Sequence, residues 1–396
     1  MRLLHVGKFF PPHPGGIERV CAELAAASAE HGVATAVLAH AEPGTWRTRT
    51  LGRDGVEVRL VACPGRLLYA PVSPSFPWQL DRLVRRFRPD LLHLHVPNTS
   101  AFWALFSPAA RRVPWIVHWH ADIPLDSRHG GLRLAYRLYR PWERALLARA
   151  HAIVATSEPY RDSSTALAAW RNKVQVIPLG IPDATDTRVA PSSSLSWPGA
   201  GLRILAVGRL SYFKGFDVLL RALAEVEHAS LLLVGDGECR GKLERLAREL
   251  GIAARVRFAG RVDMSDEGQA ALAAAYAAAD VFCLPSTERA ESFGLVLLEA
   301  MRAGVPVVAS AIAGSGVGYV VRDGETGLLV PPGDARALAA ALGRLLADAP
   351  QRKRFGEAGR ERWRAEFTLE RSVARTLALY RAVLADRDSG SRAPAM

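Results

Sequence analysis

Short apolar runs alternate along this chain with longer stretches in which apolar residues recur at helical spacing. Five runs in the first half have the composition of buried strands, namely "RLLHVG", "ATAVLA", "DLLHLH", "WIVHWH" and "AIVATS". A helical stretch follows the first run, from Ile17 to about His31. Strands that alternate with helices in this way predict parallel sheets built from βαβ units.

The same pattern starts again after a segment rich in Ser, Thr, Pro and Gly, with the runs "RILAVGRL", "SLLLVGDG", "RVRFAG", "VFCLPS" and "VPVVAS". We predict an α/β chain of two doubly wound, Rossmann-like domains, at residues 1–185 and 201–365, joined by a linker at 186–200. Residues 366–396 are predicted to form a C-terminal helix that crosses back to the first domain and ends in a disordered tail. Such domains bind ligands at the carboxyl ends of their strands, so the predicted site is the cleft between them.

Composition narrows the class of protein. With 396 residues, 49% hydrophobic and 23% charged, the chain is predicted to be globular, and its net charge of +12 favours an anionic partner. Phosphorylated substrates and acidic membranes fit that charge, whereas nucleic acid is the weaker alternative because no recognised binding motif accompanies it. The four cysteines lack metal-ligand spacing, which predicts free thiols in a reducing cytoplasm. No stretch resembles a secretory signal or reaches the roughly 18 apolar residues that span a bilayer, so we expect a cytoplasmic protein.

Two loops at predicted strand ends carry chemistry. "VGRLSYFKG" supplies Arg209 and Lys214, a guanidinium and an ammonium that can hold the two phosphates of a diphosphate; two solvated surface cations are the alternative. "ERAESFGLVLLEA" sets Glu291 before a predicted helix start and Glu299 about a turn and a half into the helix. A carboxylate can accept two hydroxyl hydrogen bonds from a sugar or ribose, although helix caps and salt bridges would also use such acids. The amides around Gly294 lie at the helix N-terminus, where anions bind.

These motifs, together with "GDGE", "FAGRV" and "DGETGLLVPPGD", resemble those of the retaining glycosyltransferases of family 4, which have the GT-B fold. The resemblance covers nearly the whole chain, and the two glutamates match the family's E-x7-E signature. It implies that residues 1–185 bind the acceptor and residues 201–365 bind a nucleotide sugar.

The resemblance also assigns roles. Arg209 and Lys214 would hold the donor diphosphate, Glu299 the ribose and Glu291 the transferred sugar, and His120 matches an active-site histidine that contacts that sugar. The catalytic set is therefore His120, Arg209, Lys214 and Glu291. The donor-binding set comprises Gly15, Gly16, Gly208, Arg209, Lys214, Arg261, Glu291, Ser292, Phe293, Gly294, Leu295 and Glu299. No metal or other cofactor is expected, because cations of the chain neutralise the diphosphate.

Histidines alternate on two predicted strands. His118 and His120 lie on one side of "WIVHWH", and His93 and His95 lie on one side of "DLLHLH". A strand-end histidine is more often structural, so only the resemblance favours a functional role for His120. We expect His93 and His95 to shape the site rather than to catalyse, and no ligand set has the spacing of a zinc site.

One departure from the family narrows the subgroup. "GSGVGYVV" places Tyr319 where many members have a glutamate, and with "HWHADI" it looks most like bacterial transferases that use GDP-mannose. Their acceptors are polyprenyl-diphosphate-linked saccharides of exopolysaccharide, O-antigen or lipopolysaccharide. The alternatives are a UDP-sugar-dependent transferase with another glycolipid or small-molecule acceptor, a GT-B enzyme of another reaction, and a catalytically dead carbohydrate-binding relative.

Segment 73–90 combines aromatic residues with four arginines, a pattern that suits an anionic membrane surface. We therefore expect peripheral association with the inner face of the cytoplasmic membrane. The alternative is an ordinary surface helix whose apolar stripe packs on the sheet.

Overall fold

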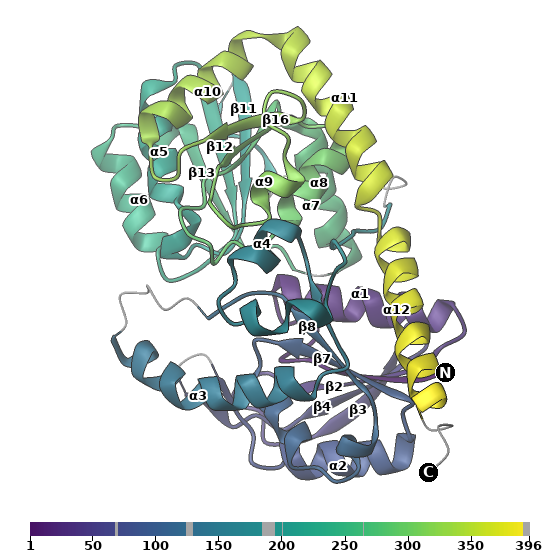
Figure 1. Cartoon of the computed structure of the whole chain (residues 1–396). Coiled ribbons are helices and arrows are strands. Elements are labelled where there is room, and N and C mark those ends of the chain that lie inside the picture. The colour runs from purple at the N-terminus through teal and green to yellow at the C-terminus, as the bar shows by residue number, and fades with distance from the viewer. Residues whose placement is uncertain (68–69, 124–129, 184–194, 200, 264, 391–396) are drawn as a thin grey trace. The chain divides into compact units, whose positions relative to one another are not determined.

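The computed structural model describes residues 1–396 except 68–69, 124–129, 184–194, 200, 264 and 391–396 (Figure 1). Contacts divide the chain into two compact units: unit 1 comprises residues 1–178 and 369–396, and unit 2 comprises residues 179–368. The divisions fall after residues 178 and 368, where the sequence pattern predicted boundaries at 185 and 365. Most of the predicted linker 186–200 and the end of the predicted tail lie outside the described residues.

Unit 1 is built on a sheet whose described strands have the order β10-β9-β8-β7-β1-β2-β4-β3 (Figure 1). The strands are β1 (Arg2–Val6), β2 (Ala34–His40), β3 (Arg49–Arg53), β4 (Val56–Val61), β7 (Leu91–Val96), β8 (Trp115–Trp119), β9 (Ala152–Ala155) and β10 (Val174–Val176). Neighbours are parallel except β3 and β4, and a separate small hairpin joins β5 (Gly65–Leu67) to β6 (Ala70–Val72). All five predicted strands of this half are present, because near-continuous apolar runs suit parallel strands buried on both faces.

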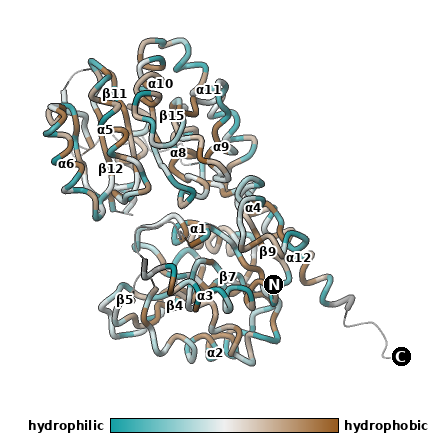
Figure 2. The backbone as a smooth tube through the Cα atoms, turned by 60° about the vertical axis from the view of Figure 1, so that its left-hand side comes forward, coloured by the Kyte–Doolittle hydropathy of each residue, from teal (hydrophilic) through white to brown (hydrophobic). Residues whose placement is uncertain are grey.

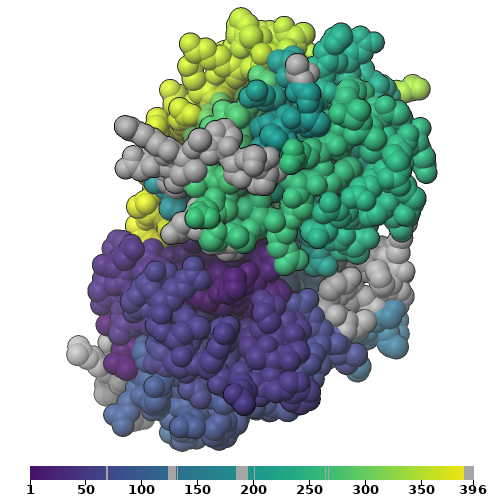
Figure 3. Space-filling model, turned by 180° about the vertical axis from the view of Figure 1, so that it is seen from behind, coloured from purple at the N-terminus to yellow at the C-terminus, as the bar shows by residue number. Residues whose placement is uncertain are grey.

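The helices of unit 1 cover this sheet. They are α1 (Gly16–Glu30), α2 (Phe76–Phe87), α3 (Gly130–Arg149), α4 (Glu158–Ser163) and α12 (Leu369–Gly390), with the 3-10 helices η1 (Thr99–Leu105), η2 (Ala110–Arg112) and η3 (Ala168–Lys173). The C-terminal helix α12 packs on unit 1, where Val373, Leu377 and Tyr380 are buried together with Leu3 and Ile116. From behind, the surface of unit 1 consists largely of the first quarter of the chain (purple to blue in Figure 3).

Unit 2 contains a parallel sheet whose described strands have the order β13-β12-β11-β14-β15-β16. The strands are β11 (Leu202–Val207), β12 (Ala229–Val234), β13 (Val256–Gly260), β14 (Val281–Leu284), β15 (Val307–Ser310) and β16 (Gly327–Val330). The helices are α5 (Phe216–Glu225), α6 (Arg240–Glu249), α7 (Asp266–Ala278), α8 (Leu295–Ala303), α9 (Val317–Val320), α10 (Ala335–Ala347) and α11 (Ala349–Glu366), with η5 (Tyr212–Lys214) and η6 (Ala253–Arg255). Figure 2 shows β11 and β12 as apolar strands (brown), in agreement with the apolar runs from which the sequence predicted them.

The strand orders locate the ligand-binding edge of each unit. In unit 2 the chain runs outward from β11 to β13 and then returns to β14 on the other side of β11. In unit 1 the same reversal separates β1 from β7. Open α/β sheets bind ligands at the carboxyl ends of the strands that flank such a reversal. The loops after β11 and β14 in unit 2, and after β1 and β7 in unit 1, are therefore the expected ligand-binding positions.

The structure also describes the thiols and the apolar helices. All four cysteines are free, and burial raises the pKa of the Cys21 and Cys283 thiols. Among the described residues, no helix combines the length and apolar character that crossing a bilayer requires.

Candidate active site

The loop after β11, residues 208–215, presents Lys214 at the end of η5. Gly215 follows with φ 65°, and a Cβ atom there would lie 2.0 Å from the carbonyl oxygen of Pro285 in the loop after β14. The amide of Thr287 also donates to the carbonyl of Phe213 at 2.8 Å. Only glycine permits this approach, and it brings the two predicted loops into contact at the strand reversal of unit 2.

Lys214 and Glu291 form an ion pair between these loops. The ammonium nitrogen lies 2.6 Å from Oε2 of Glu291, and the two side chains are only 13% and 9% exposed. The hydroxyl of Ser286 donates to the same carboxylate oxygen at 2.8 Å. Two nearly buried charges that are paired and hydrogen-bonded hold each other in place. The sequence suggested both residues as ligands of a donor, and the structure adds that they contact each other.

The other two predicted cations are exposed. Arg209 keeps 64% of its side-chain surface in solvent and lies 3.3 Å from Glu238. Arg261 is also exposed, at the end of β13. Gly208 lies beside Lys214, since a Cβ atom on it would be 3.5 Å from the ammonium nitrogen. Arg209 is therefore free to move toward a ligand, whereas Lys214 is already held.

Helix α8 begins as the sequence predicted. Gly294 precedes it with φ 82°, a left-handed conformation, and the helix starts at Leu295. Phe293 is buried, so the chain enters the helix from a fixed position. The positive end of the helix dipole and the amides of the first turn make this point suitable for a phosphate.

Glu299 lies inside α8 and is 5% exposed. The hydroxyl of Tyr276, on α7, donates to its Oε2 atom at 2.8 Å. A carboxylate accepts hydrogen bonds from hydroxyl groups, as it does here from Tyr276. Tyr276 was absent from the sequence analysis, because nothing in its neighbourhood marks it as a partner of a residue 23 positions later.

The glycine-rich segment "GSGVGYVV" braces the loop that carries Glu291. Ser315 donates its hydroxyl to the Glu291 carbonyl, and the Gly316 amide donates to the Ser292 carbonyl at 2.8 Å. Arg289 donates to the Gly314 carbonyl at 3.1 Å. The segment therefore supports the loop that carries Glu291 through the Ser315 hydroxyl and the backbone groups of Gly314 and Gly316. The sequence did not reveal this role.

In unit 1, Gly15 and Gly16 stand at the start of α1. A Cβ atom on Gly15 would lie 2.0 Å from Oε2 of Glu18, so this glycine gives space to a buried carboxylate. Burial raises the pKa of Glu18. The predicted donor-binding residues Gly15 and Gly16 therefore lie beside the buried carboxylate of Glu18.

Five buried histidines lie together across β1, β7 and β8, and we call them the histidine cluster: His5, His93, His95, His118 and His120. Strand register aligns them, since His5 pairs with His93 and His95 pairs with His118. Ring nitrogens join His5 Nδ1 to His95 Nε2 at 3.0 Å and His95 Nδ1 to His120 Nε2 at 2.9 Å. A second line joins His93 Nε2 to His118 Nδ1 at 3.2 Å, and His93 Nδ1 contacts the Tyr380 hydroxyl of α12. His5 was missed in the sequence because it stands alone in its strand.

The histidine cluster is neutral in character. Burial lowers the pKa of all five imidazoles, to about 3 for His5 and for His118. Ligand nitrogens of His95, His118 and His120 lie within 4.8 Å of one another, close enough for a metal ion. However, the rings of His118 and His120 stack at 4.0 Å with an angle of 11°, so their in-plane lone pairs run side by side instead of converging. Nitrogens of His5, His93 and His95 lie equally close. In both groups the rings stack, and ring nitrogens hydrogen-bond to one another.

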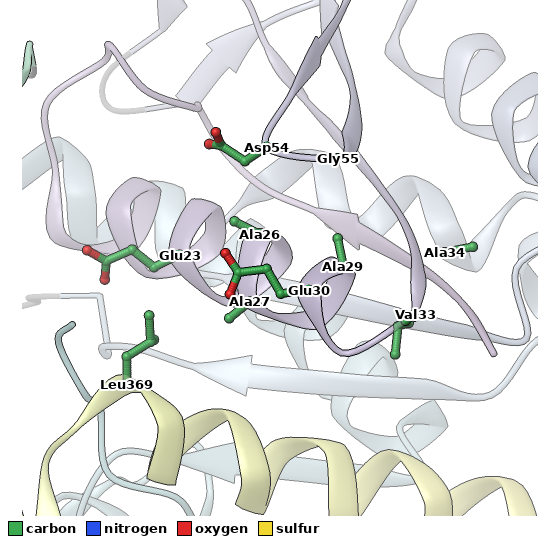
Figure 4. A pocket seen from close by; sticks show the side chains of 11 residues that line it. Glu23, Ala26, Ala27, Ala29, Glu30, Val33, Ala34, Asp54, Gly55 and Leu369 are labelled. Atoms are coloured by element: carbon green, nitrogen blue, oxygen red, sulfur yellow. The ribbon is translucent and has the colours of Figure 1, made fainter. Parts of the chain in front are cut away.

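A surface hollow of unit 1 does not overlap these residues. It is lined by α1, the turn between β3 and β4, and Leu369 of α12 (Figure 4). Glu23, Glu30 and Asp54 stand at its edge (Figure 4). Three carboxylates would repel a nucleotide diphosphate, so this hollow is a poor donor site.

Comparison with known proteins gives consistent matches to both halves of the chain. Residues 192–362 match the model of the "Glycosyl transferases group 1" family, and residues 15–180 match the "Glycosyl transferase 4-like domain". The chain is 30% identical over 395 residues to the O-antigen chain mannosyltransferase C of Escherichia coli, covering 97% of this chain and 99% of the relative. It is 33% identical over 358 residues to a phosphatidyl-myo-inositol mannosyltransferase of Mycobacterium leprae, covering 88% of each.

Solved structures agree on the fold. Sucrose-phosphate synthase from Thermosynechococcus elongatus superimposes with a TM-score of 0.79 at 26% identity, over 98% of this chain and all of that chain. HepE of Anabaena, solved in complex with UDP-glucose, superimposes with a TM-score of 0.72 at 22% identity, over 96% and 99% of the two chains. The predicted GT-B fold, with two Rossmann-like domains, is thereby confirmed.

Proposed function

The chain belongs to the glycosyl transferases of group 1, and we propose that it moves mannose from GDP-mannose onto a lipid-linked saccharide with retention of anomeric configuration. The mannose donor is supported by two relatives that are named mannosyltransferases. The acceptor would be a polyprenyl-diphosphate-linked saccharide of exopolysaccharide, O-antigen or lipopolysaccharide, which the O-antigen relative supports. A UDP-sugar donor is the alternative, because HepE was solved with UDP-glucose.

One observation carries the proposal. The loops after β11 and β14 meet at the strand reversal of unit 2 and bring Lys214 and Glu291 together. The start of α8 follows Glu291 by four residues, so a cation, an acid and a helix N-terminus all belong to one loop pair. All three suit a nucleotide sugar: the cation and the helix N-terminus can bind its diphosphate, and the acid can accept hydrogen bonds from its sugar hydroxyls.

The proposed chemistry is mainly electrostatic. The sugar–phosphate bond breaks as the anomeric carbon gains positive charge and the leaving diphosphate gains negative charge. Lys214, the mobile Arg209 and the amides at Gly294 would stabilise that negative charge where it develops. Glu291 would bind the transferred sugar and Glu299 the ribose, while His120 would contact the sugar from unit 1.

The ion pair changes how Lys214 would act. Without a donor, the Lys214 ammonium is neutralised by Glu291. The two negatively charged phosphates of a bound diphosphate would compete with Glu291 for this ammonium. The Ser286 hydroxyl, which donates to the Glu291 carboxylate, would remain as its donor if the lysine shifted toward the diphosphate. In this proposal Glu291 holds the sugar and does not act as a nucleophile, because its carboxylate is already bound by Lys214 and Ser286. That role fits attack of the acceptor from the same face as departure of the diphosphate. A leaving phosphate oxygen would accept the acceptor's proton.

The basic surface of unit 1 is proposed to contact the anionic membrane that carries the acceptor. The apolar stripe of α2 is buried, with Phe76, Leu80 and Leu83 in the core, so within segment 73–90 only the opposite face is available. There Trp78 is 58% exposed and the Arg82 guanidinium lies 5.1 Å from its ring centroid.

A second group of exposed aromatic residues lies at η1 and α3. Trp103 and Phe106 lie 5.8 Å apart between ring centroids, and Phe106 and Trp142 lie 5.2 Å apart. Leu138, one turn before Trp142, is 74% exposed. Four exposed arginines lie along α3 at helical spacing, namely Arg133, Arg137, Arg140 and Arg144. Apolar side chains beside arginines fit the headgroup region of an anionic bilayer, at about 1 kcal/mol for each basic residue near the surface.

A panel of nucleotide sugars scored by thermal unfolding tests the donor. A ligand at 100 times its Kd should stabilise the chain by about 2.7 kcal/mol, and GDP-mannose should exceed UDP-glucose. Transfer to a polyprenyl-diphosphate saccharide should follow, with the α-anomer as product, and turnover should survive dialysis against EDTA. A β-linked product, stabilisation by UDP-sugars alone, or loss of activity in EDTA would each overturn its part of the proposal.

A further inference from the structure

Only one of the two lines of hydrogen bonds in the histidine cluster reaches His120. It runs from His5 through His95 to Nε2 of His120, whereas the other line ends at His118. We propose that His95, supported by His5, is a positioning residue that fixes the ring and the tautomer of His120. The inference rests on the proposed contact between His120 and the transferred sugar.

The direction of the line follows from counting protons. A neutral imidazole carries one N–H donor and one bare acceptor nitrogen, so fixing one bond fixes all the others. If His95 Nδ1–H donates to His120 Nε2, then His95 Nε2 accepts from His5 Nδ1–H, and His5 Nε2 is a bare acceptor. If the line runs the other way, His5 Nε2 must carry a proton.

The end of the line at His5 Nε2 decides between the two directions. Among the described residues, His5 Nε2 is buried and has no hydrogen-bond partner. A buried N–H without a partner is rarer than an acceptor without one. The structure therefore favours the first direction, in which His120 accepts at Nε2 and carries its proton on Nδ1.

Packing holds this state. The His120 ring stacks on His118 at 4.0 Å and lies nearly parallel to the His95 ring, at 12°. Burial lowers the pKa of His95 and of His120, so both rings stay neutral at ordinary pH. His120 would then present an N–H from Nδ1 to its ligand, which selects an oxygen lone pair of the sugar or phosphate as the atom it recognises.

Nitrogen NMR of the full-length wild-type chain, labelled in histidine, tests the tautomer without any substrate. The expected spectrum shows His120 with a protonated Nδ1 and a bare Nε2, identified by loss of its signals in His120→Gln. A protonated Nε2 on His120 would overturn the assignment. Because this measurement needs no turnover, a chain that fails to transfer mannose but shows the expected tautomer would reject the proposed function and keep the positioning role.

Kinetics test the role in the reaction. His95→Phe removes the donor to His120 and should lower kcat by roughly 10- to 100-fold, with KM for the donor changed less than threefold. His93→Phe is the matched control, because His93 lies on the same strand, is equally buried and belongs to the other line. His95→Gln should recover part of kcat, since its amide both donates and accepts. Equal losses in His95→Phe and His93→Phe, or no recovery in His95→Gln, would show that His95 is merely structural.

Discussion

Removing one partner of the Lys214–Glu291 pair should destabilise unit 2 as well as stop the reaction. The Lys214 nitrogen lies 2.6 Å from the Glu291 carboxylate and the pair is nearly buried, so Lys214→Met leaves a carboxylate whose remaining hydrogen-bond donor among the described residues is the Ser286 hydroxyl. Breaking a buried pair in this way costs about 3–5 kcal/mol. For a unit of this size each kcal/mol lowers Tm by about 2–4 °C, so we expect a decrease of roughly 6–20 °C.

An exposed pair supplies the matched control. Lys353 and Glu357 lie 3.9 Å apart with side chains 78% and 66% exposed. Lys353→Met should change the free energy of unfolding by less than about 1 kcal/mol, because solvent screens such pairs. Calorimetry or urea unfolding of both variants measures the difference directly.

The double variant separates stability from catalysis. Lys214→Met combined with Glu291→Leu leaves no unpaired charge, and replacing a buried pair by apolar side chains is often nearly neutral. We therefore expect the double variant to regain most of the lost stability while transfer stays at least 100-fold below wild type. The reasoning is refuted if Lys214→Met is no less stable than Lys353→Met, or if the double variant is less stable than both single variants.

Three further predictions concern binding, pH and the membrane. Glu299→Ala should weaken binding of the bare nucleoside diphosphate in calorimetry, while Glu291→Ala should spare it and impair turnover of the sugar donor; equal losses would contradict the split. Because the pKa values of the histidine cluster are lowered in the folded state, the unfolded chain takes up more protons between pH 6.5 and the native values. The free energy of unfolding of unit 1 should therefore fall as pH drops below 6.5, by up to about 1.4 kcal/mol for each histidine and each pH unit. A urea midpoint that stays constant from pH 7 to 5 would argue against neutral buried rings. Charge reversal at Arg137, Arg140 and Arg144 should abolish sedimentation with anionic vesicles but spare a short soluble acceptor, and unchanged sedimentation would move the contact away from α3.

The strands were predictable because their physical signal is local. Each buried parallel strand is a nearly continuous apolar run, and the runs identified in the sequence correspond to strands in both sheets. The β3–β4 hairpin was missed although Asp54 and Gly55 are a typical turn pair, since its strands are partly exposed and lack such a run. Local composition therefore gives the centre of a sheet more readily than its edge.

The contacts within the site were not predictable in the same way. The E-x7-E spacing placed Glu291 and Glu299 on either side of a helix start, which α8 confirms. The partner of Glu291 lies 77 residues away, and its identity depends on the strand order that places β14 beside β11. The histidine cluster needs the order β8-β7-β1, which no local pattern contains.

Segment 73–90 shows why amphipathic patterns are ambiguous. Its apolar stripe could face either a sheet or a bilayer, and the structure buries it against the sheet. On α3, by contrast, Leu138 and Trp142 stay exposed although the sequence did not single them out. Burial of a stripe depends on what the fold places opposite, so the sequence alone identifies a candidate surface but not which side of it is free.

The position of the basic excess also separates the two proposed binding events. In the donor site of unit 2, Lys214 and Arg209 each lie beside an acid, so these two cations add little net charge before a donor arrives. The sequence of α3 combines several arginines with a single acid, Glu143, which is buried. Burial holds the pKa of Glu143 at about 7, which further reduces its negative charge. The net charge of +12 would therefore act mainly in the proposed approach to the acceptor. A long-range electrostatic attraction can concentrate the protein at a negatively charged surface. In the proposed function, recognition of the donor would depend instead on short contacts that form when a diphosphate displaces Glu291 from Lys214.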